Sequence, residues 1–595
     1  LLSVLIARGF KIALHARTDF DRFLASGLTV LLGIQSVVIV YGVLGILPLT
    51  GVTLPFVSYG KSSLLSCFFL AGLLLSISGD GVKDISGVHP ATVRALKWLA
   101  TGMLVLLLGV AGIGRLLFVQ GLNADQIAGR TIDTPDADGY TRPHVNPRLK
   151  AIEAAIPRGS IYDRNGLVLA TSRTDELTGM NAEDLIKRPK GRYFPYGSAF
   201  AHIVGYVDPK CGGPGGIESS RNGELRGFAD YSELLPIYRQ SHMPNTPQLK
   251  GKDVRLTIDA KLQESVERAL IKYTGELRDR RTGERKHKAA AVVIDVYSGE
   301  ILACASIPDF DPNALTPGIW KSYNKNENHE SVLVNRAVNG LYPPGSTFKL
   351  VTATGALENG LSPSYTCRHQ EYGVRWTANG HNYSRKRITD EAGMQPHGLT
   401  NLAKAVRVSC NVFFAHLGID LGADKLYDTA RKYGLSRIPP PKKLGEDLPD
   451  NAYGQGVIEV TPLEMARVVA AIANDGVMMK PHFVKEITSG NETLERIQPE
   501  EMGRPLSKES AAILQKMMAD VTKNGTARGV FDGLSVAGKT GSAENDHADR
   551  MAHSWFVGFA PIRDPRIAFA VVVENGGHGR SAAGPICREI VKAAL

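Results

Sequence analysis

The sequence has few cysteines, and none of them lies in a metal-binding or disulfide-rich pattern. The chain of 595 residues contains six cysteines without C-x-x-C spacing: Cys67, Cys211, Cys304, Cys367, Cys410 and Cys587. This scatter argues against a zinc module and against a dense disulfide framework, although one bridge among the last five stays open. His547 and His553 are six residues apart, which is not the spacing of two helical ligands, so we predict no metal site and no cofactor.

The sequence also lacks the features of a nucleic-acid-binding protein. Its formal net charge is +10, which suits an anionic membrane surface or an anionic polymer as a neighbour. However, it contains no basic helix and no aromatic platform interleaved with basic residues. We therefore expect contact with membrane lipid and no binding of nucleic acid.

Charged side chains are missing from three long stretches, which cover residues 23–60, 62–79 and 98–114. The first stretch is interrupted near Pro48. A hydrocarbon core about 30 Å thick needs ~20 mostly apolar helical residues, and each stretch comes close to that length. Buried helices of a soluble protein are the alternative, but charge is rarely absent from them over such lengths. The sequence therefore predicts α-helical transmembrane segments.

Basic residues indicate the orientation of these segments. Arg8, Lys11, Arg17 and Arg22 precede the first segment, and a second basic cluster at residues 83–97 separates the second from the third. By the positive-inside rule both clusters lie in the cytoplasm, so everything after about residue 120 is extracytoplasmic. No cleavable site follows a single short apolar stretch, which excludes a signal peptide.

The predicted extracytoplasmic part divides into two regions by its pattern of secondary-structure signals. Residues 120–250 contain short strand-like pieces among many glycines and prolines and predict an irregular β-rich module. Residues 251–595 begin with strand, helix and strand, continue with helices and end with a hairpin. This order predicts one α+β domain in which helices cover an antiparallel sheet.

The stretch Pro343-Pro-Gly-Ser-Thr-Phe-Lys349 places a serine and a lysine three residues apart at the start of a predicted helix. Proline and glycine before Ser346 end any preceding element, and Asn359-Gly360 close the helix, which we expect over residues 346–358. Residues at i and i+3 share a helix face, so the Ser346 hydroxyl can meet the Lys349 amine. This arrangement suits a nucleophile beside its base, whereas a capping serine and a solvated lysine are the alternative for an isolated motif.

Two further motifs follow in the same predicted domain. Ser409-Cys-Asn411 comes at the end of a helical segment, and Lys539-Thr-Gly541 lies at the start of a strand and precedes Ser542. S-x-x-K, S-x-N and K-T-G in this order are far more specific than any one of them alone. The sequence therefore predicts a site for serine acyl transfer.

Residues 146–595 resemble a class B penicillin-binding protein, the membrane-anchored D,D-transpeptidase of bacterial cell walls. Pro157-Arg-Gly-Ser-Ile-Tyr-Asp-Arg-Asn-Gly166 is similar to the non-catalytic pedestal of that family, and Tyr453-Gly-Gln-Gly456 is similar to its transpeptidase domain. The resemblance implies a pedestal domain followed by the penicillin-binding α+β fold. It also implies peptidoglycan stem peptides ending in D-Ala-D-Ala as donors, and β-lactams as ligands.

Residues 45–60 resemble the terminal loop of the SEDS (shape, elongation, division, sporulation) polymerases, the group of FtsW and RodA, although Lys61 replaces their usual glycine. The catalytic acidic loop of that family would precede residue 1, so we expect a truncated polymerase module that does not polymerise glycan by itself. The expected domains are this module (1–80), a cytoplasmic linker (81–94), a transmembrane anchor (95–119), the pedestal (120–250) and the transpeptidase domain (251–595). The resemblance implies a multi-pass protein of the bacterial plasma membrane whose partners are a SEDS polymerase and other elongation or division proteins.

The resemblance also assigns the reacting groups. Ser346 is the nucleophile and Lys349 is its base, which has to be a neutral amine, a state that burial and the nearby cation of Lys539 favour. The backbone N–H groups of Ser346 and Ser542 would form the oxyanion hole. Ser409 would relay a proton to the leaving amine.

The remaining motif residues would bind the donor peptide. Asn411 would hold the peptide amide, Lys539 with Thr540 would bind the carboxylate, and Gly541 would leave room for the peptide along the strand. The family usually has threonine at position 542, and Ser542 keeps both the hydroxyl and the N–H.

Alternatives to these readings stay open. Cys410 is expected to be a packed side chain because no motif places a histidine beside it, and Glu218 and Arg226 are expected to be structural. A D,D-carboxypeptidase or β-lactamase would pass the acyl group to water, and a scaffold or β-lactam sensor would use the fold without catalysis. The large pedestal and the membrane anchor favour the transpeptidase.

Overall fold

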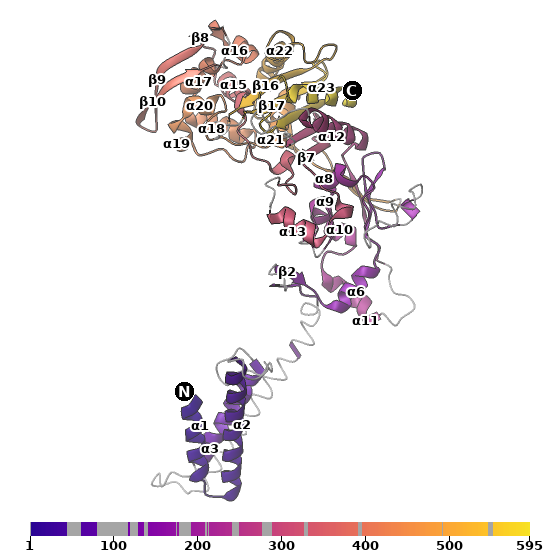
Figure 1. Ribbon diagram of the computed structural model, residues 1–595, viewed down its shortest axis with the longest axis vertical. Helices are drawn as coiled ribbons and strands as arrows, with labels where there is room; N and C mark the ends of the chain where they lie inside the picture. Colours follow the sequence, from indigo (N-terminus) through magenta and orange to yellow (C-terminus); the bar gives the residue numbers. More distant parts are fainter. Residues whose placement is uncertain are drawn as a thin grey trace. The chain divides into compact units, whose positions relative to one another are not determined.

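The computed structural model describes residues 2–43, 61–79, 117–118, 129–135, 141–173, 175–177, 192–208, 211, 214–240, 249–275, 288–325, 331–390, 395–490, 492–544 and 551–595. The chain forms two compact units, Leu1–Ala128 and Gly129–Leu595 (Figure 1). Each unit has a hydrophobic core of its own.

The first unit contains three described helices, α1 (Leu2–Leu14), α2 (Asp19–Val43) and α3 (Lys61–Gly79). Its core consists of small and aliphatic side chains, Ala13, Ala25, Leu32, Cys67 and Leu74. Within the described ranges, no helix reaches both the length and the hydropathy that a membrane span requires. The uncharged stretch 98–114 and the predicted linker 81–94 lie outside the described residues.

A five-stranded antiparallel sheet forms the centre of the second unit. Its strands lie in the order β16 (Ala537–Ala543), β17 (His553–Ala560), β18 (Ile567–Val573), β6 (Ala289–Asp295) and β7 (Ile301–Ile307). Every residue of β18 and of β7 is buried. The continuous apolar runs predicted these strands, because a strand that is covered on both faces has no polar side to alternate with.

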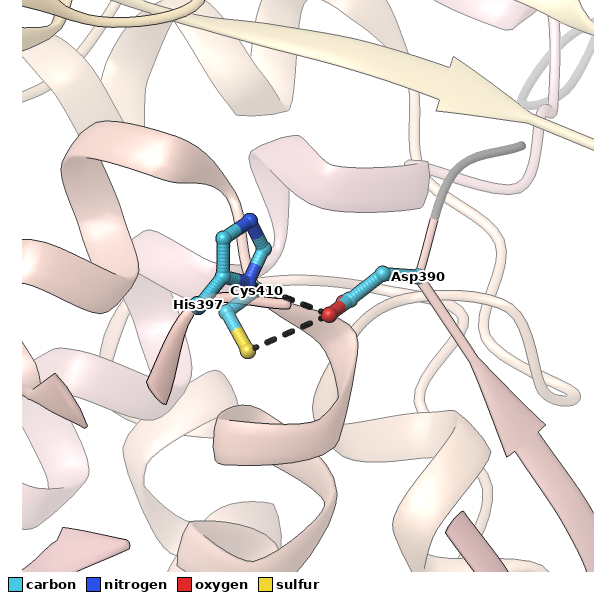
Figure 2. Close-up of side chains that lie close together, drawn as sticks. All are labelled: Asp390, His397 and Cys410. Carbon is cyan, nitrogen blue, oxygen red and sulfur yellow. Dashed lines mark hydrogen bonds and ion pairs between the residues drawn. The ribbon is translucent and has the colours of Figure 1, made fainter. Parts of the chain in front are cut away.

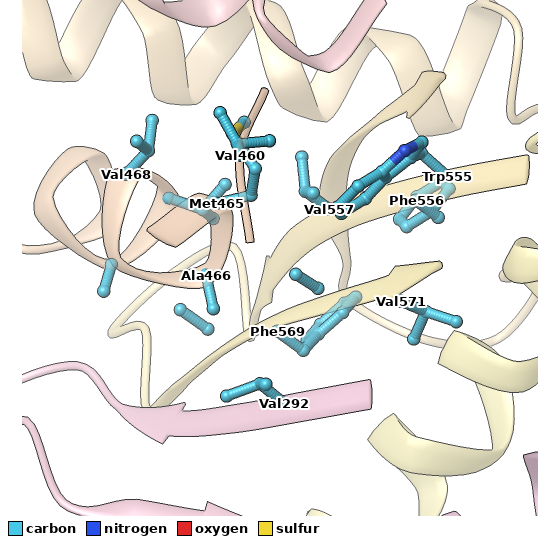
Figure 3. Close-up of a cluster of buried hydrophobic side chains, with 14 of the residues drawn as sticks. Val292, Val460, Met465, Ala466, Val468, Trp555, Phe556, Val557, Phe569 and Val571 are labelled. Carbon is cyan, nitrogen blue, oxygen red and sulfur yellow. The ribbon is translucent and has the colours of Figure 1, made fainter. Parts of the chain in front are cut away.

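Helices cover this sheet, as the sequence predicts. Helix α21 (Pro462–Ala473) covers one face, and α12 (Ala260–Gly275) and α23 (Ala583–Ala594) pack together on the other. Figure 3 shows α21 beside the strands, with Met465 and Ala466 on the side of Val557 and Phe569. The predicted α+β domain with an antiparallel sheet under helices is therefore confirmed.

The edge strand β16 packs against helix α22 (Lys508–Asn524) and against the turn that carries Ser346. Helices α15 (Lys349–Glu358), α16 (Leu402–Val408) and α17 (Asn411–Leu421) carry or border the motif residues Lys349, Ser409 and Asn411, and α18 (Ala423–Lys432) and α20 (Leu448–Ala452) pack against them. The helix predicted over 346–358 is a 3-10 turn, η7 (Gly345–Thr347), followed by α15. A backbone φ of +53° at Gly345 allows the tight entry into this turn.

Small antiparallel sheets flank these helices. Their strands are β8 (Ser364–Cys367) with β11 (Gly398–Asn401), and β9 (Gln370–Ala378) with β10 (His381–Thr389). Trp376 of β9 stacks on Tyr383 of β10 and donates a hydrogen bond to the carbonyl of Gly445 at 2.7 Å. This contact ties the β9–β10 hairpin to the body of the unit.

A second five-stranded sheet takes two of its strands from the segment 120–250, for which the sequence predicts a pedestal. Its strands lie in the order β14 (Glu492–Arg496), β13 (Val484–Ser489), β5 (Asp253–Leu256), β3 (Ile161–Tyr162) and β4 (Val168–Ala170). The sheet thus takes strands from both sides of residue 250, where the sequence suggests a boundary. Nearby, the buried Glu218 of α9 (Gly216–Ser220) pairs with Arg158 at 2.7 Å and with Arg192 at 2.5 Å, which is a structural contact.

Candidate active site

The side chains of Ser346 and Lys349 meet, as their spacing predicts. Ser346 lies in turn η7, Lys349 is the first residue of α15, and the Lys349 Nζ is 3.0 Å from the Ser346 Oγ. Lys349 is fully buried. The rings of Phe414 and Tyr453 flank its amine, with centroids at 5.6 and 6.0 Å.

The Lys349 amine also contacts two oxygens outside the S-x-x-K motif. Its Nζ is 2.7 Å from the carbonyl oxygen of Ser409 and 2.7 Å from the Oδ1 of Asn411. Both oxygens can only accept hydrogen bonds, and together they take up the two N–H bonds of a neutral amine. The lone pair of that amine is then left for a hydroxyl proton, so the geometry fits a base beside a nucleophile.

Ser409 lies between two lysines. Its Oγ is 3.2 Å from the Lys349 Nζ and 2.8 Å from the Lys539 Nζ. The residue ends helix α16 in the left-handed conformation, with φ 58° and ψ 41°, and α17 begins two residues later. Strained backbone of this kind is uncommon outside glycine and clusters at functional sites. The turn brings the Ser409 hydroxyl into reach of both amines.

The K-T-G motif lies in the middle of the edge strand β16. Lys539 is fully buried, and its Nζ also donates to the carbonyl of Thr540 at 2.9 Å. The Oγ1 of Thr540 is 2.7 Å from the Oγ1 of Thr526. The three motifs therefore converge on one site, joined through the hydroxyl of Ser409.

The edge of β16 faces the site. The carbonyl of Ser542 accepts a hydrogen bond from the Gln455 side chain rather than from β17. Because the N–H and the carbonyl of one residue point to the same side of a strand, the N–H of Ser542 also points away from β17. The carbonyl of Thr540 points the same way, since it accepts from Lys539.

Gly541 allows β16 to approach turn η7 closely. A Cβ on this residue would lie 2.9 Å from the Thr347 Cγ2 and 2.9 Å from the Trp555 Cβ, so the protein itself fills the space beside Gly541. Close packing of strand and turn thus requires glycine here, in addition to the role in peptide binding that the sequence suggests.

Asn411 is fixed by the residues that follow strand β10. Its Nδ2 donates to the carbonyl of Thr389 at 2.9 Å, and its backbone N–H donates to the Asp390 Oδ1 at 2.5 Å. Asp390 in turn pairs with the Nδ1 of His397 at 3.1 Å and accepts from the Cys410 thiol at 3.6 Å (Figure 2). The sequence did not predict this cluster, because no motif spacing joins its three members.

The cluster holds a protonated thiol and a charged histidine. The hydrogen bond with Asp390 raises the pKa of His397 to about 9. A hydrogen bond with Cys367, together with burial, raises the pKa of the Cys410 thiol, so Cys410 is no nucleophile. One ligand atom from each of Asp390, His397 and Cys410 lies within 4.8 Å of the others. These donors could hold a divalent ion such as Zn²⁺ once His397 and Cys410 had lost their protons.

Comparisons with known proteins match the chain to two families. The family described as "Penicillin binding protein transpeptidase domain" matches residues 289–592, and the family described as "Cell cycle protein", that of FtsW, RodA and SpoVE, matches residues 1–81. Both resemblances read from the sequence are thereby confirmed.

Curated relatives and solved structures are similar over much of the chain. Peptidoglycan D,D-transpeptidase PbpA of Mycolicibacterium smegmatis is 29% identical, over 77% of this chain and 93% of its own. Peptidoglycan D,D-transpeptidase MrdA of Escherichia coli K12 is 28% identical, over 76% and 88%. The imipenem acyl-enzyme complex of penicillin-binding protein A from M. tuberculosis is similar with a TM-score of 0.61 and 27% identity, covering 75% of this chain and 99% of that one. The chain belongs to the penicillin-binding protein transpeptidase family.

Proposed function

We propose that this protein is a peptidoglycan D,D-transpeptidase that cross-links cell-wall stem peptides through a serine acyl-enzyme. One observation carries the proposal: the Lys349 Nζ is 3.0 Å from the Ser346 Oγ, while two acceptor-only oxygens take up its N–H bonds. Acyl transfer through a serine needs a base within reach of the hydroxyl, and a buried lysine can serve as that base.

The reaction follows from these contacts in two halves. Neutral Lys349 takes the Ser346 proton as the Oγ bonds to the carbonyl carbon of the penultimate D-alanine. The N–H groups of Ser346 and Ser542 stabilise the oxyanion that forms. Collapse breaks the peptide bond, and the proton passes through Ser409 to the leaving amine of D-alanine. The amine of a second stem peptide then attacks the ester, loses its proton through the same groups and releases Ser346.

Substrate contacts complete the proposal. Lys539 and Thr540 bind the carboxylate of the donor peptide, Asn411 holds its amide, and the outer edge of β16 pairs with the peptide as an added edge strand. The amine of Lys539 is buried next to the Ser409 hydroxyl, and strand β16 holds it in place. A carboxylate that reaches this amine would form a charge-assisted hydrogen bond with it.

We also propose a place for the protein in the cell and a division of its chain. The match of residues 1–81 to the cell cycle family and the uncharged stretches support a multi-pass protein of the bacterial plasma membrane with an extracytoplasmic transpeptidase domain. The proposed modules are those expected above, with boundaries near residues 80, 94, 119 and 250. A SEDS polymerase and other elongation or division proteins are the proposed partners.

The test uses the full chain and its Ser346→Ala variant. The wild type should gain the mass of a fluorescent penicillin on Ser346 and should convert uncross-linked peptidoglycan with D-Ala-D-Ala stems into cross-linked dimers. The variant should do neither. Hydrolysed monomer as the sole product would identify a D,D-carboxypeptidase, and cross-linking that survives in the variant would favour a scaffold whose partner does the chemistry.

A further inference from the structure

One tripeptide touches both sides of the site. Residues Tyr453, Gly454 and Gln455 follow helix α20 and lie between turn η7 and strand β16. The carbonyl of Gly454 accepts a hydrogen bond from the N–H of Gly345 at 2.9 Å, next to the nucleophile. The Gln455 Nε2 donates to the carbonyl of Ser542 at 2.9 Å, and the Gln455 Oε1 accepts from the N–H of Glu544 at 3.1 Å.

The Gln455 side chain therefore pairs with β16 as a neighbouring strand would. It uses its donor and its acceptor on two residues of the same edge, on the side away from β17. The N–H of Ser542, which points to this edge, belongs to the same residue as the carbonyl that Gln455 holds. The orientation of that N–H thus depends on the side chain of Gln455.

The tripeptide has little freedom to move. A Cβ on Gly454 would lie 2.1 Å from the carbonyl oxygen of Gly345, and φ at this residue is +84°, so only glycine allows the approach. The backbone N–H of Gln455 donates to the carbonyl of Asp450 at 2.9 Å. Helix α20 thereby anchors a rigid connection between the turn that carries Ser346 and the strand that carries Ser542.

We propose that Gln455 is a positioning residue, which holds the N–H of Ser542 at the distance from the N–H of Ser346 that a tetrahedral oxyanion needs. The inference rests on the proposed function, because it concerns the oxyanion hole of that reaction. Gln455 would not touch the substrate. Loss of Gln455 would slow the acylation step. A misplaced N–H donor stabilises the transition state much less, whereas the stability of the bound ground state changes little.

The test compares Gln455→Ala and Gln455→Glu with the wild type in the full chain. Glutamate has the size of glutamine and keeps an oxygen for the N–H of Glu544, but it cannot donate to the carbonyl of Ser542. We expect the limiting rate of acylation by fluorescent penicillin to fall by about 10- to 100-fold in both variants, with the affinity of the preceding non-covalent complex changed by less than about threefold. Affinity for a peptide boronic acid, which forms a tetrahedral adduct with Ser346, should fall by a similar factor.

Gln515→Ala is the matched control. The Gln515 Nε2, on helix α22, also donates to backbone carbonyls, but these are the carbonyls of Ile472 at 2.8 Å and Ala473 at 3.4 Å in helix α21 and not a carbonyl of β16. This variant should acylate at the wild-type rate. Wild-type rates in both Gln455 variants, or a loss confined to the non-covalent affinity, would overturn the inference while the proposed function stood. A wild-type protein that penicillin does not acylate on Ser346 would overturn both.

Discussion

At the scale of single residues, the site depends on the buried amine of Lys349 and on the hydrogen-bond acceptors around it. Lys349 contacts two acceptor-only oxygens and two hydroxyls, and all but the Ser346 hydroxyl come from Ser409 and Asn411, which lie 60 and 62 residues further along the chain. The S-x-x-K spacing predicts the contact with Ser346. It does not predict the carbonyl of Ser409, which reaches the amine because α16 ends in a left-handed turn.

Replacement of this lysine tests its role as the base. Lys349→Met keeps most of the side-chain length but removes the nitrogen. We expect acylation by fluorescent penicillin to slow by about 10²- to 10⁴-fold. The free energy of unfolding should fall by about 1–3 kcal/mol, because the buried carbonyl of Ser409 loses its donor. Stopped-flow fluorescence and thermal unfolding measure the two effects.

Lys404→Met is the control for this variant. The Lys404 Nζ also donates to backbone carbonyls, those of His397 and Leu399, but it does not contact Ser346. It should therefore leave acylation unchanged. Acylation within tenfold of the wild type in Lys349→Met would rule out this amine as the base.

The Asp390–His397 pair predicts a pH dependence of stability. The pKa of His397 is raised from 6.5 to about 9 by Asp390, so the pair contributes fully below pH 6.5 and is lost as the pH rises through about 9. The pKa of Asp390 is lowered: burial alone would raise it, but the hydrogen bonds with His397 and with the Asn411 N–H, together with nearby positive charge, more than offset this, so its contribution is lost again as the pH falls below about 4. The histidine shift corresponds to at most roughly 3 kcal/mol.

The His397→Gln variant removes the ion pair with Asp390 and so isolates its contribution to stability. The difference in Tm between the wild type and the variant should be largest at pH 5–6 and should shrink towards pH 10, as measured by thermal unfolding across that range. A difference that stayed constant with pH would mean that His397 stabilises the fold by packing alone.

At the scale of elements, apolar runs were the informative signal. Residues 289–294 and 567–573 are continuous apolar runs, and both lie in central strands of the main sheet. Strands β9 and β10 were not predicted. Most of their side chains are exposed, and Arg385, Lys386 and Arg387 give no alternation of apolar and polar residues. The Asp390–His397–Cys410 cluster was missed for a related reason, since the hairpin ahead of it decides where Asp390 lies.

The pedestal elements depend on one buried carboxylate. Glu218→Gln would leave Arg158 and Arg192 without the charge that neutralises them, so we expect a loss of about 3–5 kcal/mol in the free energy of unfolding. Glu224→Gln is the control, because Glu224 pairs with Arg221 where both side chains are about 30% exposed, and it should cost less than about 1 kcal/mol. Denaturant unfolding distinguishes the two, and equal losses would contradict the structural role of Glu218.

At the scale of the whole molecule, all eight motif residues belong to the second compact unit. A fragment of residues 129–595 should therefore fold and should be acylated by penicillin within about twofold of the full-chain rate, because it keeps its own core. Intact mass and stopped-flow kinetics measure this, with Ser346→Ala in the same fragment as the blank. Acylation more than tenfold slower would show that residues 1–128 support the site.

The pedestal sheet has a consequence for how the chain matures. Strand β5 pairs with β3 on one side, but it finds its other neighbour, β13, only when a far later part of the chain has been made. During synthesis the growing polypeptide therefore carries an unsatisfied β edge, and pairing across so long a loop is slow. The nascent chain should depend on chaperone protection over this interval, and the emergence of β13 should set the moment at which this sheet becomes resistant to proteases.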